Sequence, residues 1–331
     1  MDVVRLAVIG SGNMGRSLAN GTKDLEIARI VCAADPDAAR AQALADEHQA
    51  RTATPDEAIA SGEVDAVLIA APNDLHCDLT LQAAQAGKHV FCEKPMALSR
   101  AECRRMIAAC EQAGVKLMIG QVLRYLPVFE TITELLAQED FGRRIAMTTT
   151  RVAGGWAGGM WDVGWRGRAD QSGGVLFEVS QHELDYMRCI LGEADTVYSL
   201  QGHFVRPEVD YPDDLHVLIR FQSGATGYLH AGLAAILGAY DGKILCEQGT
   251  ILYDNGRGEV TYKLEGHDVA TINTRERHFE PGVRKEVRQF CEAILRDEAP
   301  PIPGSEGLRN VALAEAAVES ARTGQPVAVQ R

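Results

Sequence analysis

Residues 3–35 read VVRLAVIGSGNMGRSLANGTKDLEIARIVCAAD, and this stretch decides the fold of the first part of the chain. It begins with a short apolar run rich in β-branched residues at 3–9, passes through a glycine turn, and continues in a helical pattern at 14–23. A second strand pattern follows at 27–34. Strand, turn, helix and strand in this order predict the beginning of a parallel sheet with crossover helices.

The turn itself is a G-x-G-x-x-G motif that follows a predicted strand and opens a predicted helix. Glycine at these places permits a tight turn, the approach of backbone N–H groups to a pyrophosphate, and close packing of helix on strand. Asp35 stands at the end of the second predicted strand, where its carboxylate can accept hydrogen bonds from a ribose. The motif alone is a weak signal, but together with Asp35 it predicts an NAD site that includes Gly10, Gly12, Asn13, Met14, Gly15 and Asp35.

The alternation of strands and helices continues through the first third of the chain. Two helix starts carry capping boxes, at Thr54-Pro55-Asp56-Glu57 and at Ser99-Arg100-Ala101-Glu102. We therefore expect an α/β fold, a Rossmann domain with a doubly wound parallel sheet over residues 1–122. The remaining elements expected here are helices at 37–47 and 75–86 and strands at 64–71, 89–92 and 116–120.

The pattern changes after residue 122. No further strand–helix cycle follows, and the turn signals Ser223-Gly224 and Asn255-Gly256 favour hairpins. Residues 123–331 are therefore expected to form an α+β domain with a mostly antiparallel open sheet, for substrate binding and oligomerisation. Its expected strands are 145–151, 196–204, 215–221, 225–233, 243–246 and 259–264, with a helix at 128–138 and two amphipathic helices at the end, the last at 305–322.

Composition narrows the class of ligand. A formal net charge of −13 disfavours a nucleic-acid partner, because phosphate binding needs a basic face. No run of apolar residues is long enough to cross a membrane and no signal peptide stands at the N-terminus, so a cytoplasmic protein is expected. The eight cysteines show neither C-x-x-C nor zinc-ligand spacing, which favours structural thiols and no metal site.

Two further loops follow predicted strands at their carboxyl ends, where doubly wound folds bind ligands. The first is APNDLH at 71–76, which adds Pro72, Asn73 and His76 to the expected cofactor site. The second is Glu93-Lys94-Pro95. A single lysine after a strand is more often a solvent-exposed charge than a catalytic residue. The expected position of Lys94 beside a nicotinamide pocket favours the catalytic interpretation.

A third group of polar residues follows Gly173-Gly174. Glu178, His182 and Asp185 have the spacing i, i+4 and i+7, so they are expected on one helix face. Such a face is usually solvated. A histidine between two carboxylates can nevertheless have its tautomer fixed and its basicity raised, which suits proton transfer from an alcohol.

The chain resembles the Gfo/Idh/MocA family of oxidoreductases over essentially its whole length. The resemblance rests on AVIGSGNMG, the APNDLH and CEKP loops, the helix around VLFEVSQHELD, and the terminal AEAAVESARTGQPVAV. It implies that Lys94 and His182 are the catalytic pair, with Glu93 beside Lys94 at the cofactor. Glu178 stands where the family usually has aspartate, and Ser180 where it usually has glycine, which puts the contact of Glu178 and the substrate in doubt.

The resemblance implies an NAD-dependent dehydrogenase that transfers hydride between nicotinamide and a hydroxyl or keto carbon of a sugar, cyclitol or glycoside. A homodimer or homotetramer is the usual assembly. The alternatives are a non-catalytic NAD-sensing regulator, a ketosugar reductase working in the opposite direction, and a glycoside-processing enzyme that oxidises and re-reduces its substrate with bound NAD.

The substrate and the cofactor preference are expected from individual side chains. Asp35 and Asp37 favour NAD over NADP by repelling a 2′-phosphate, although Arg40 could soften this effect. A neutral polyol is the expected substrate. Its expected site contains Lys94, Arg124, Trp165, Arg166, Glu178, His182 and Asp185. Trp165 and Arg166 belong to a tryptophan- and glycine-rich stretch at 154–167, which either closes over the ligand or anchors the domain core or an oligomer contact.

Overall fold

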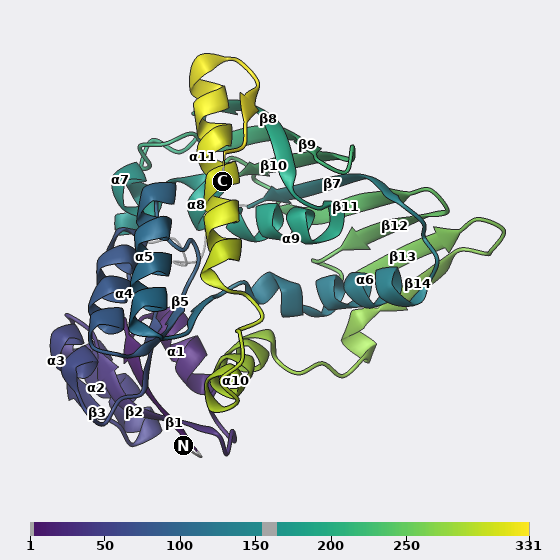
Figure 1. Cartoon of the computed structure of the whole chain (residues 1–331). Helices are drawn as coiled ribbons and strands as arrows, with labels where there is room; N and C mark the ends of the chain where they lie inside the picture. Colours follow the sequence, from purple (N-terminus) through teal and green to yellow (C-terminus); the bar gives the residue numbers. More distant parts are fainter. Residues whose placement is uncertain (1–2, 154–163, 331) are drawn as a thin grey trace. The chain divides into compact units, whose positions relative to one another are not determined.

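The computed structural model describes residues 3–153 and 164–330 of the chain. These residues form two compact units (Figure 1). The first contains residues 1–122 and 280–311, and the second contains residues 123–279 and 312–331.

The first unit is built on a parallel sheet of six strands, counted over the described residues, in the order β3-β2-β1-β4-β5-β6. This order confirms the doubly wound Rossmann sheet predicted from the sequence. β3, a short strand that the sequence analysis did not identify, forms one edge. The strands are β1 (Val4–Ile9), β2 (Ala28–Ala34), β3 (Arg51–Ala53), β4 (Ala66–Ile69), β5 (His89–Cys92) and β6 (Leu117–Ile119).

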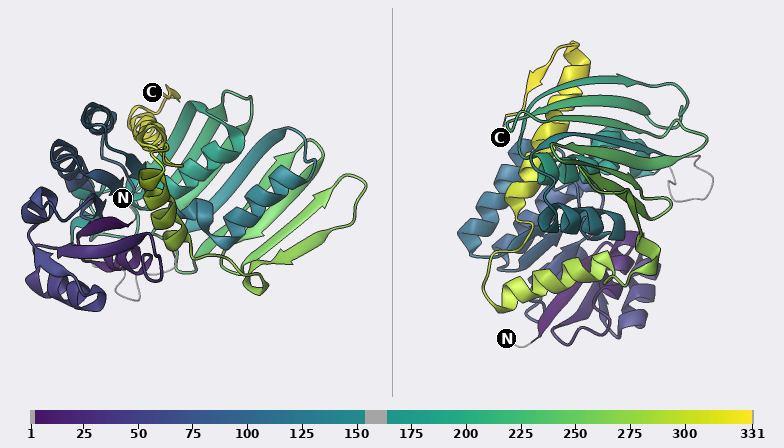
Figure 2. Two further views of the ribbon diagram at one scale, coloured as in Figure 1. Left: turned by 60° about the horizontal axis from the view of Figure 1, so that its bottom comes forward. Right: turned by 90° about the vertical axis from the view of Figure 1, so that its right-hand side faces the viewer.

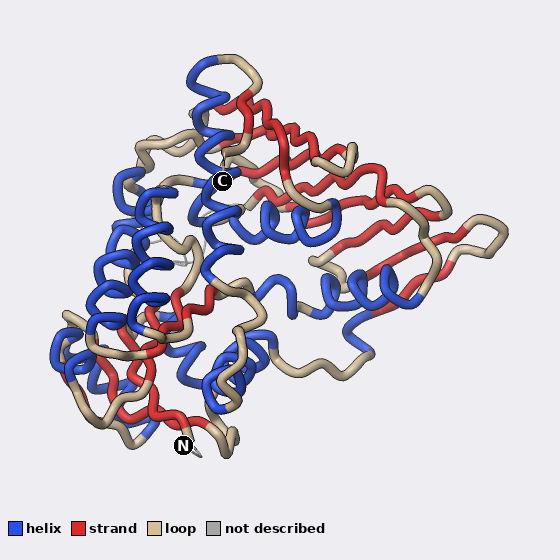
Figure 3. Tube along the Cα trace, in the orientation of Figure 1, coloured by secondary structure: helices blue, strands red, loops and turns tan. Residues whose placement is uncertain are grey.

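Helices alternate with these strands along the chain, as Figure 3 shows by colour. The capping box at Thr54 is confirmed, since its side chain accepts the N–H of Glu57 while the Glu57 carboxylate accepts the N–H of Thr54. Ser99 likewise accepts the N–H of Glu102 at the start of its helix. The helices are α1 (Asn13–Asn20), α2 (Ala38–His48), α3 (Pro55–Ala60), η1 (Asn73–Leu75), α4 (His76–Gln85), α5 (Arg100–Ala113) and α10 (Gly282–Leu295).

Residues 280–311 belong to the first unit, whereas the sequence analysis placed them in the second domain. Phe290 of α10 packs edge-to-face on Phe91 of β5, with ring centroids 5.8 Å apart. The Glu286 carboxylate accepts the backbone N–H of Gln121 at 2.5 Å. An amphipathic pattern predicts a helix but does not say which sheet the helix covers, so this assignment was beyond the sequence.

The second unit contains a sheet with the order β14-β13-β12-β11-β7-β10-β9-β8-β15 among its described residues. Every pairing is antiparallel except that of β7 with β10, which confirms the expected sheet. Its strands are β7 (Arg144–Val152), β8 (Ala194–Gly202), β9 (Asp214–Phe221), β10 (Thr226–Gly232), β11 (Ala239–Cys246), β12 (Gly249–Asp254), β13 (Glu259–Leu264), β14 (Ala270–Asn273) and β15 (Val327–Ala328).

Two helices, α6 (Pro127–Gln138) and α9 (Gln181–Leu191), lie along one face of this sheet (Figure 2). Alternate residues of the strands are buried on that face, as Leu215, Val217 and Ile219 are on β9. On the opposite face Leu200, Leu218 and Leu252 are 56%, 53% and 47% exposed. This face of the sheet is therefore open, and three large apolar side chains on it are about half exposed.

The remaining helices of the second unit are short, apart from the last. They are η2 (Val122–Tyr125), η3 (Trp165–Gly167), α7 (Ala169–Ser172), α8 (Val175–Glu178), η4 (Thr274–Glu276) and α11 (Gly304–Thr323), whose first turns belong to the first unit. Across residues 3–153 and 164–330, no helix is long and apolar enough to cross a membrane.

The cysteines fit the expectation of structural thiols. All eight lie among the described residues, none of them is in a disulfide, and all are buried except Cys189. Burial raises the pKa of the Cys110 and Cys291 thiols to about 12, so both stay protonated near neutral pH.

Candidate functional site

The loop between β1 and α1 needs its three glycines for three different reasons. Gly10 has a φ of +95°, and a Cβ there would stand 2.6 Å from the carbonyl oxygen of Ala70. A Cβ at Gly15 would stand 1.8 Å from the carbonyl oxygen of Gly10. A Cβ at Gly12, by contrast, would meet no described atom within 4 Å. The space beside Gly12 suits a bound pyrophosphate, because backbone N–H groups can approach a ligand closely there.

The first turn of α1 carries its N–H groups beside this space. Its N-cap is Gly12, which brings no side-chain capping bond to the described helix start, and Asn13 and Met14 are its first two residues. The N-terminus of a helix has a partial positive charge and N–H groups without intrahelical partners. The loop and the helix start can therefore hold a diphosphate.

Asp35 joins this loop to the end of β2. One carboxylate oxygen accepts the backbone N–H of Ser11 at 2.7 Å, and the other accepts that of Asp37 at 2.8 Å. Each oxygen of a carboxylate has a second lone pair, so Asp35 can still accept ribose hydroxyls. Asp37 caps α2 by accepting the N–H groups of Ala39 and Arg40.

Three loops lie at the carboxyl ends of three neighbouring parallel strands. The glycine loop follows β1, the loop with Pro72 and Asn73 follows β4, and the loop with Glu93 and Lys94 follows β5. The order of the sheet reverses between β1 and β4, and such a switch point is where doubly wound sheets bind ligands. Within the first unit, the sequence-predicted cofactor residues are thus brought to one edge of the sheet.

His76 connects two of these loops. Its Nδ1 lies 2.7 Å from the carbonyl oxygen of Pro95, and its Nε2 lies 3.0 Å from that of Ala71. The side chain is fully buried. The structure therefore places His76 between the backbones of the 71–76 and 93–95 loops.

Gly120 supports the loop that contains Lys94, and the sequence analysis did not identify this residue. A Cβ at Gly120 would stand 2.9 Å from Oε1 of Glu93, so only glycine leaves room for that carboxylate. Glu93 itself is 7% exposed. The signal in the sequence was a glycine at the end of a predicted strand.

In the second unit, Glu178 and His182 do not share one continuous helix. Glu178 ends α8 and α9 begins at Gln181, so that part of the expectation was wrong. The N–H of Ser180 bonds to the carbonyl of Val175, five residues back, rather than to the residue four back. This wider turn interrupts the helix between the two side chains, and an i, i+4 spacing in the sequence does not reveal it.

Both acidic residues of this group bind arginines. Glu178, 7% exposed, accepts a hydrogen bond from Nε of Arg166 at 2.8 Å. Asp185 is fully buried and receives two bonds from Arg124, at 2.7 and 2.6 Å. A bidentate contact of this kind fixes both groups in one plane. Arg166 also stacks over the ring of Trp165, with the guanidinium 4.4 Å from the centroid.

His182 is 9% exposed and lies on the first turn of α9. The next residue, Glu183, anchors that turn to the sheet: its Oε1 accepts bonds from Arg151 Nη1 at 2.7 Å and from the Tyr240 hydroxyl at 2.5 Å. Burial, together with the charge of Glu183, holds the pKa of Tyr240 well above its ordinary value, so the hydroxyl remains a donor. The sequence gives no signal for this group, since its members come from three separate elements.

The second unit thus contains Arg124, Trp165, Arg166, Glu178, His182 and Asp185 from the sequence-predicted substrate site. They lie on η2, η3, α8 and α9. Of the tryptophan- and glycine-rich stretch, residues 154–163 lie outside the described residues.

Comparison with known proteins gives a consistent result over both units. Residues 4–121 match the model of an oxidoreductase family with an NAD-binding Rossmann fold, and residues 133–329 match the C-terminal alpha/beta domain of the same family.

Two curated relatives are 30% identical to this chain. One, from Mediterraneibacter gnavus, is named 2,7-anhydro-N-acetylneuraminate hydratase and aligns over 84% of this chain and 77% of its own length. The other, from Haloferax volcanii, is named D-xylose 1-dehydrogenase (NADP(+)) 2 and aligns over 89% of this chain and 90% of its own. Among solved structures, a levoglucosan dehydrogenase in complex with NADH and levoglucosan superposes with a TM-score of 0.89 at 22% identity, over 99% of this chain and all of the other. That likeness shows the shared fold.

Proposed function

The chain belongs to the Gfo/Idh/MocA family of oxidoreductases, and we propose that it is a dehydrogenase that transfers hydride between NAD and a hydroxyl carbon of a sugar, cyclitol or glycoside. The observation that carries this proposal is the set of loops after β1, β4 and β5, which presents the glycine turn, Asn73 and Lys94 at one edge of the sheet. The regulator alternative gives Lys94 and His182 no task.

The first unit fits a dinucleotide in particular ways. The open space at Gly12 and the start of α1 would hold the pyrophosphate, and Asp35 would accept the adenosine ribose hydroxyls. Pro72, Asn73, Glu93 and Lys94 would line the nicotinamide half, while His76 fixes the backbones of their two loops. When bound, NAD supplies an acceptor for a hydride at C4 of its nicotinamide ring.

His182 and Lys94 have different proposed roles toward the substrate hydroxyl. His182 accepts the hydroxyl proton while the carbon loses hydride and the C–O bond becomes a carbonyl. Lys94 donates a hydrogen bond to that oxygen and stabilises its developing negative charge. Glu178 and Arg166 position the segment that leads into α9. The two catalytic roles can also be exchanged, with Lys94 carrying the proton.

A neutral polyol suits the second unit better than an anion. Arg124 is paired with Asp185 and Arg166 with Glu178, so both guanidinium charges are balanced by carboxylates within hydrogen-bond distance. Groups of this kind recognise hydroxyls through directed hydrogen bonds, and they attract an anionic substituent less than unbalanced arginines would.

Turnover on a panel of inositols, aldoses, amino sugars and glycosides tests the proposal. Loss of a general base costs on the order of 10² to 10⁴ in rate, and loss of an electrostatic donor about 10² to 10³. His182→Ala and Lys94→Ala should therefore lose most of kcat, and their NAD affinity should change much less. His267→Ala and Lys263→Ala, on the exposed part of the second unit, are the matched controls. Wild-type turnover in both catalytic variants would refute the roles of Lys94 and His182, and a wild type that binds NAD but turns over no substrate of the panel would favour the regulator.

The preference for NAD over NADP is a finer part of the proposal. Asp35 stands where a 2′-phosphate would meet its carboxylate, and the nearby Arg40 is 3.4 Å from Asp37 through Nε. Asp35→Ala should raise the ratio of NADP to NAD turnover, while Asp37→Ala should change it less. Equal kcat/KM values for NAD and NADP in the wild type would contradict the preference.

A second candidate reaction is favoured by the relative named a hydratase. In such a reaction, bound NAD would oxidise the substrate and the same NADH would reduce the later intermediate, so no net oxidation results. The two candidates differ in one readout. The dehydrogenase produces one NADH for each product molecule, whereas the hydratase-type reaction forms product from an anhydro-sugar with catalytic NAD and no accumulating NADH.

We also propose that the chain assembles through the open face of the second sheet, with a second copy as the partner. The half-exposed Leu200, Leu218 and Leu252 on three strands of that face form an apolar surface that a copy can cover. Light scattering on the wild type should give a multiple of the 35.8 kDa chain mass, and Leu218→Glu should shift it toward the monomer. A monomeric wild type would refute the assembly.

A further inference from the structure

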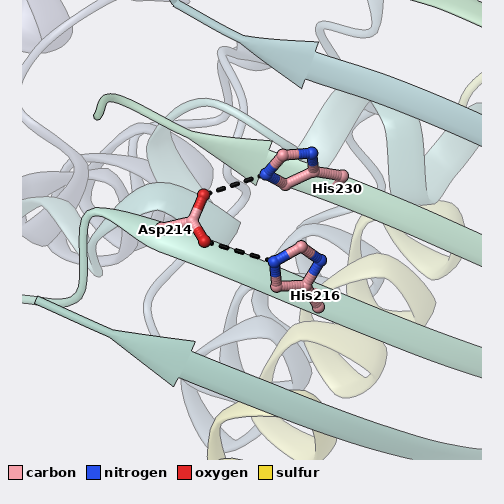
Figure 4. A group of neighbouring side chains, drawn as sticks. All are labelled: Asp214, His216 and His230. Carbon is pink, nitrogen blue, oxygen red and sulfur yellow. Dashed lines mark hydrogen bonds and ion pairs between the residues drawn. The ribbon is translucent and has the colours of Figure 1, made fainter. Parts of the chain in front are cut away.

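Three potential metal ligands meet on the open face of the second sheet (Figure 4). Asp214 and His216 are two residues apart on β9, so they point to the same face. His230 of β10 is the direct cross-strand partner of His216. The antiparallel register thus brings two imidazoles and one carboxylate together from two strands.

The distances in this group suit one shared ion. Nε2 of His230 lies 2.9 Å from Oδ1 of Asp214, and Nε2 of His216 lies 3.2 Å from Oδ2. The two rings are stacked with centroids 4.4 Å apart. All three ligand atoms lie within 4.8 Å of one another. Ligand atoms about 2.0–2.2 Å from a tetrahedral zinc ion are separated by roughly 3.3 Å, so the two stacked rings would rotate about their side-chain bonds to direct both nitrogens at one ion.

Tyr228 adds an outer contact that orients one ligand. Its hydroxyl lies 2.7 Å from Nδ1 of His216, the ring nitrogen that points away from Asp214. When Nδ1–H donates to this hydroxyl, Nε2 presents its lone pair toward the carboxylate. Metal-binding histidines are commonly held in this way by a hydrogen bond to their second nitrogen.

The group is separate from the proposed catalytic residues. Gly227, the neighbour of Tyr228, faces α9, since a Cβ there would lie 3.5 Å from Met187. Alternation along β10 therefore places Tyr228 and His230 on the opposite face of the sheet. In the single chain His216 and His230 are 43% and 29% exposed, so an ion can reach them from solvent, and a second copy placed on this face would enclose the bound ion.

We propose that Asp214, His216 and His230 bind a divalent transition-metal ion of the zinc type. Two imidazole nitrogens and one carboxylate oxygen are ligands that zinc accepts, and three protein ligands leave a fourth position for water. The ion ties β9 to β10 and has a structural role. The sequence gives no motif for it, because His230 joins the other two ligands only through the strand register.

Zinc titration of the metal-stripped, tag-free protein by calorimetry tests the site. We expect one zinc per chain. Tyr228→Phe should weaken zinc binding by about 10- to 100-fold, and His216→Gln, His230→Gln and Asp214→Asn should each weaken it by at least as much. His267→Gln, in an exposed turn of the same unit, should bind as the wild type does. Cobalt should give the visible absorption of a four-coordinate ion in the wild type and in His267→Gln, and should not give it in the three ligand variants.

Circular dichroism of each variant checks that it is folded, and light scattering separates zinc binding from assembly through the same face. Zinc that binds with unchanged stoichiometry and affinity in the His216→Gln/His230→Gln double variant belongs elsewhere and refutes the site. Failure of the wild type to bind zinc at micromolar concentrations also refutes it. Neither result bears on the dehydrogenase proposal, which is tested by turnover.

Discussion

At the scale of single residues, the glycines of the loop after β1 are needed for two different reasons: some by the fold and one by the proposed ligand. Gly10 and Gly15 are required by the protein itself, because a side chain at either position would collide with backbone atoms. Gly12 has a φ of −73°, which any residue adopts, and open space in place of a neighbour. No contact within the described protein requires glycine here, and under the proposed function the requirement comes from the bound cofactor.

Gly12→Ala should therefore keep the stability of the protein and lose cofactor binding. Alanine at the N-cap costs a few tenths of a kcal/mol to about 2 kcal/mol of helix stability, which leaves the fold intact. The added methyl group occupies the space of the pyrophosphate, so the Kd for NADH should rise at least by about the factor expected for one lost charge-assisted hydrogen bond, roughly tenfold. Fluorescence titration with NADH and a thermal melt measure the two effects.

Gly15→Ala is the matched comparison. Its methyl group would stand 1.8 Å from the carbonyl oxygen of Gly10, so this variant should lower the Tm strongly whether or not NADH is present. Unchanged NADH affinity in Gly12→Ala would show that the pyrophosphate lies elsewhere.

The candidate residues could be predicted from the sequence to different extents. Lys94 and the glycine loop are local signals, because each follows an apolar strand directly in the chain. Gly120 has only a weak local signal, a glycine at the end of a predicted strand, and Tyr240 has none. Their importance depends on contacts with Glu93 and with Glu183, which only the folded chain brings within reach. Arg124 and Arg166 were predicted to bind substrate. Their ion pairs with Asp185 and Glu178 were not predicted.

At the scale of elements, α9 is held one residue beyond His182 by an ion pair in which the Glu183 carboxylate is buried and the Arg151 side chain is 28% exposed. Arg151 of β7 and Tyr240 of β11 are direct cross-strand partners, and both donate to Glu183. Removing one partner of a buried carboxylate leaves that charge without one of its hydrogen bonds. This lowers the free energy of unfolding more than the loss of a surface contact does.

Tyr240→Phe should destabilise the second unit and disturb catalysis together. The lost hydrogen bond to a charged acceptor costs about 1.5–3 kcal/mol, which for a chain of this size lowers Tm by several degrees. A looser first turn of α9 should lower kcat more than it raises KM. Tyr198→Phe, on the open face of the same sheet, should leave both unchanged. If Tyr240→Phe shows the Tm of the wild type, Glu183 is adequately held by Arg151 alone.

Helices and strands were predicted well where the hydrophobic pattern of the segment itself determines them. They were predicted less well where contacts with distant segments determine whether an element forms or where it ends. The parallel strands of the first unit and the hairpin at Ser223-Gly224 follow from apolar runs and turn residues. The short edge strand β3 has only three residues, and β12 has no marked alternation before the Asn255-Gly256 turn. The break between α8 and α9 depends on a single wide turn, which hydrophobic spacing does not detect.

At the scale of the whole molecule, two histidines of the first unit make its stability depend on pH. Burial lowers the pKa of His48, and burial together with the charge of Lys116 lowers that of His89. His89 also accepts the backbone N–H of Lys116 through Nδ1 at 3.0 Å, a bond that only the unprotonated nitrogen can accept. In the unfolded chain both histidines return to an ordinary pKa of about 6.5.

Stability should therefore fall as the pH is lowered through this range. Below about 6.5 the unfolded chain takes up protons that the folded chain resists, and each such histidine costs up to about 1.4 kcal/mol per pH unit until its own folded pKa is reached. The Tm measured from pH 7.5 to 5.5 should decline in the wild type and decline less in the His48→Gln/His89→Gln double variant. His267→Gln, an exposed residue, should follow the wild type. The carboxylate of Asp65, whose pKa is lowered despite burial by its bonds to Arg5, contributes only near pH 4 and below, outside the range measured. An equal decline in the double variant would show that other groups control the acid sensitivity.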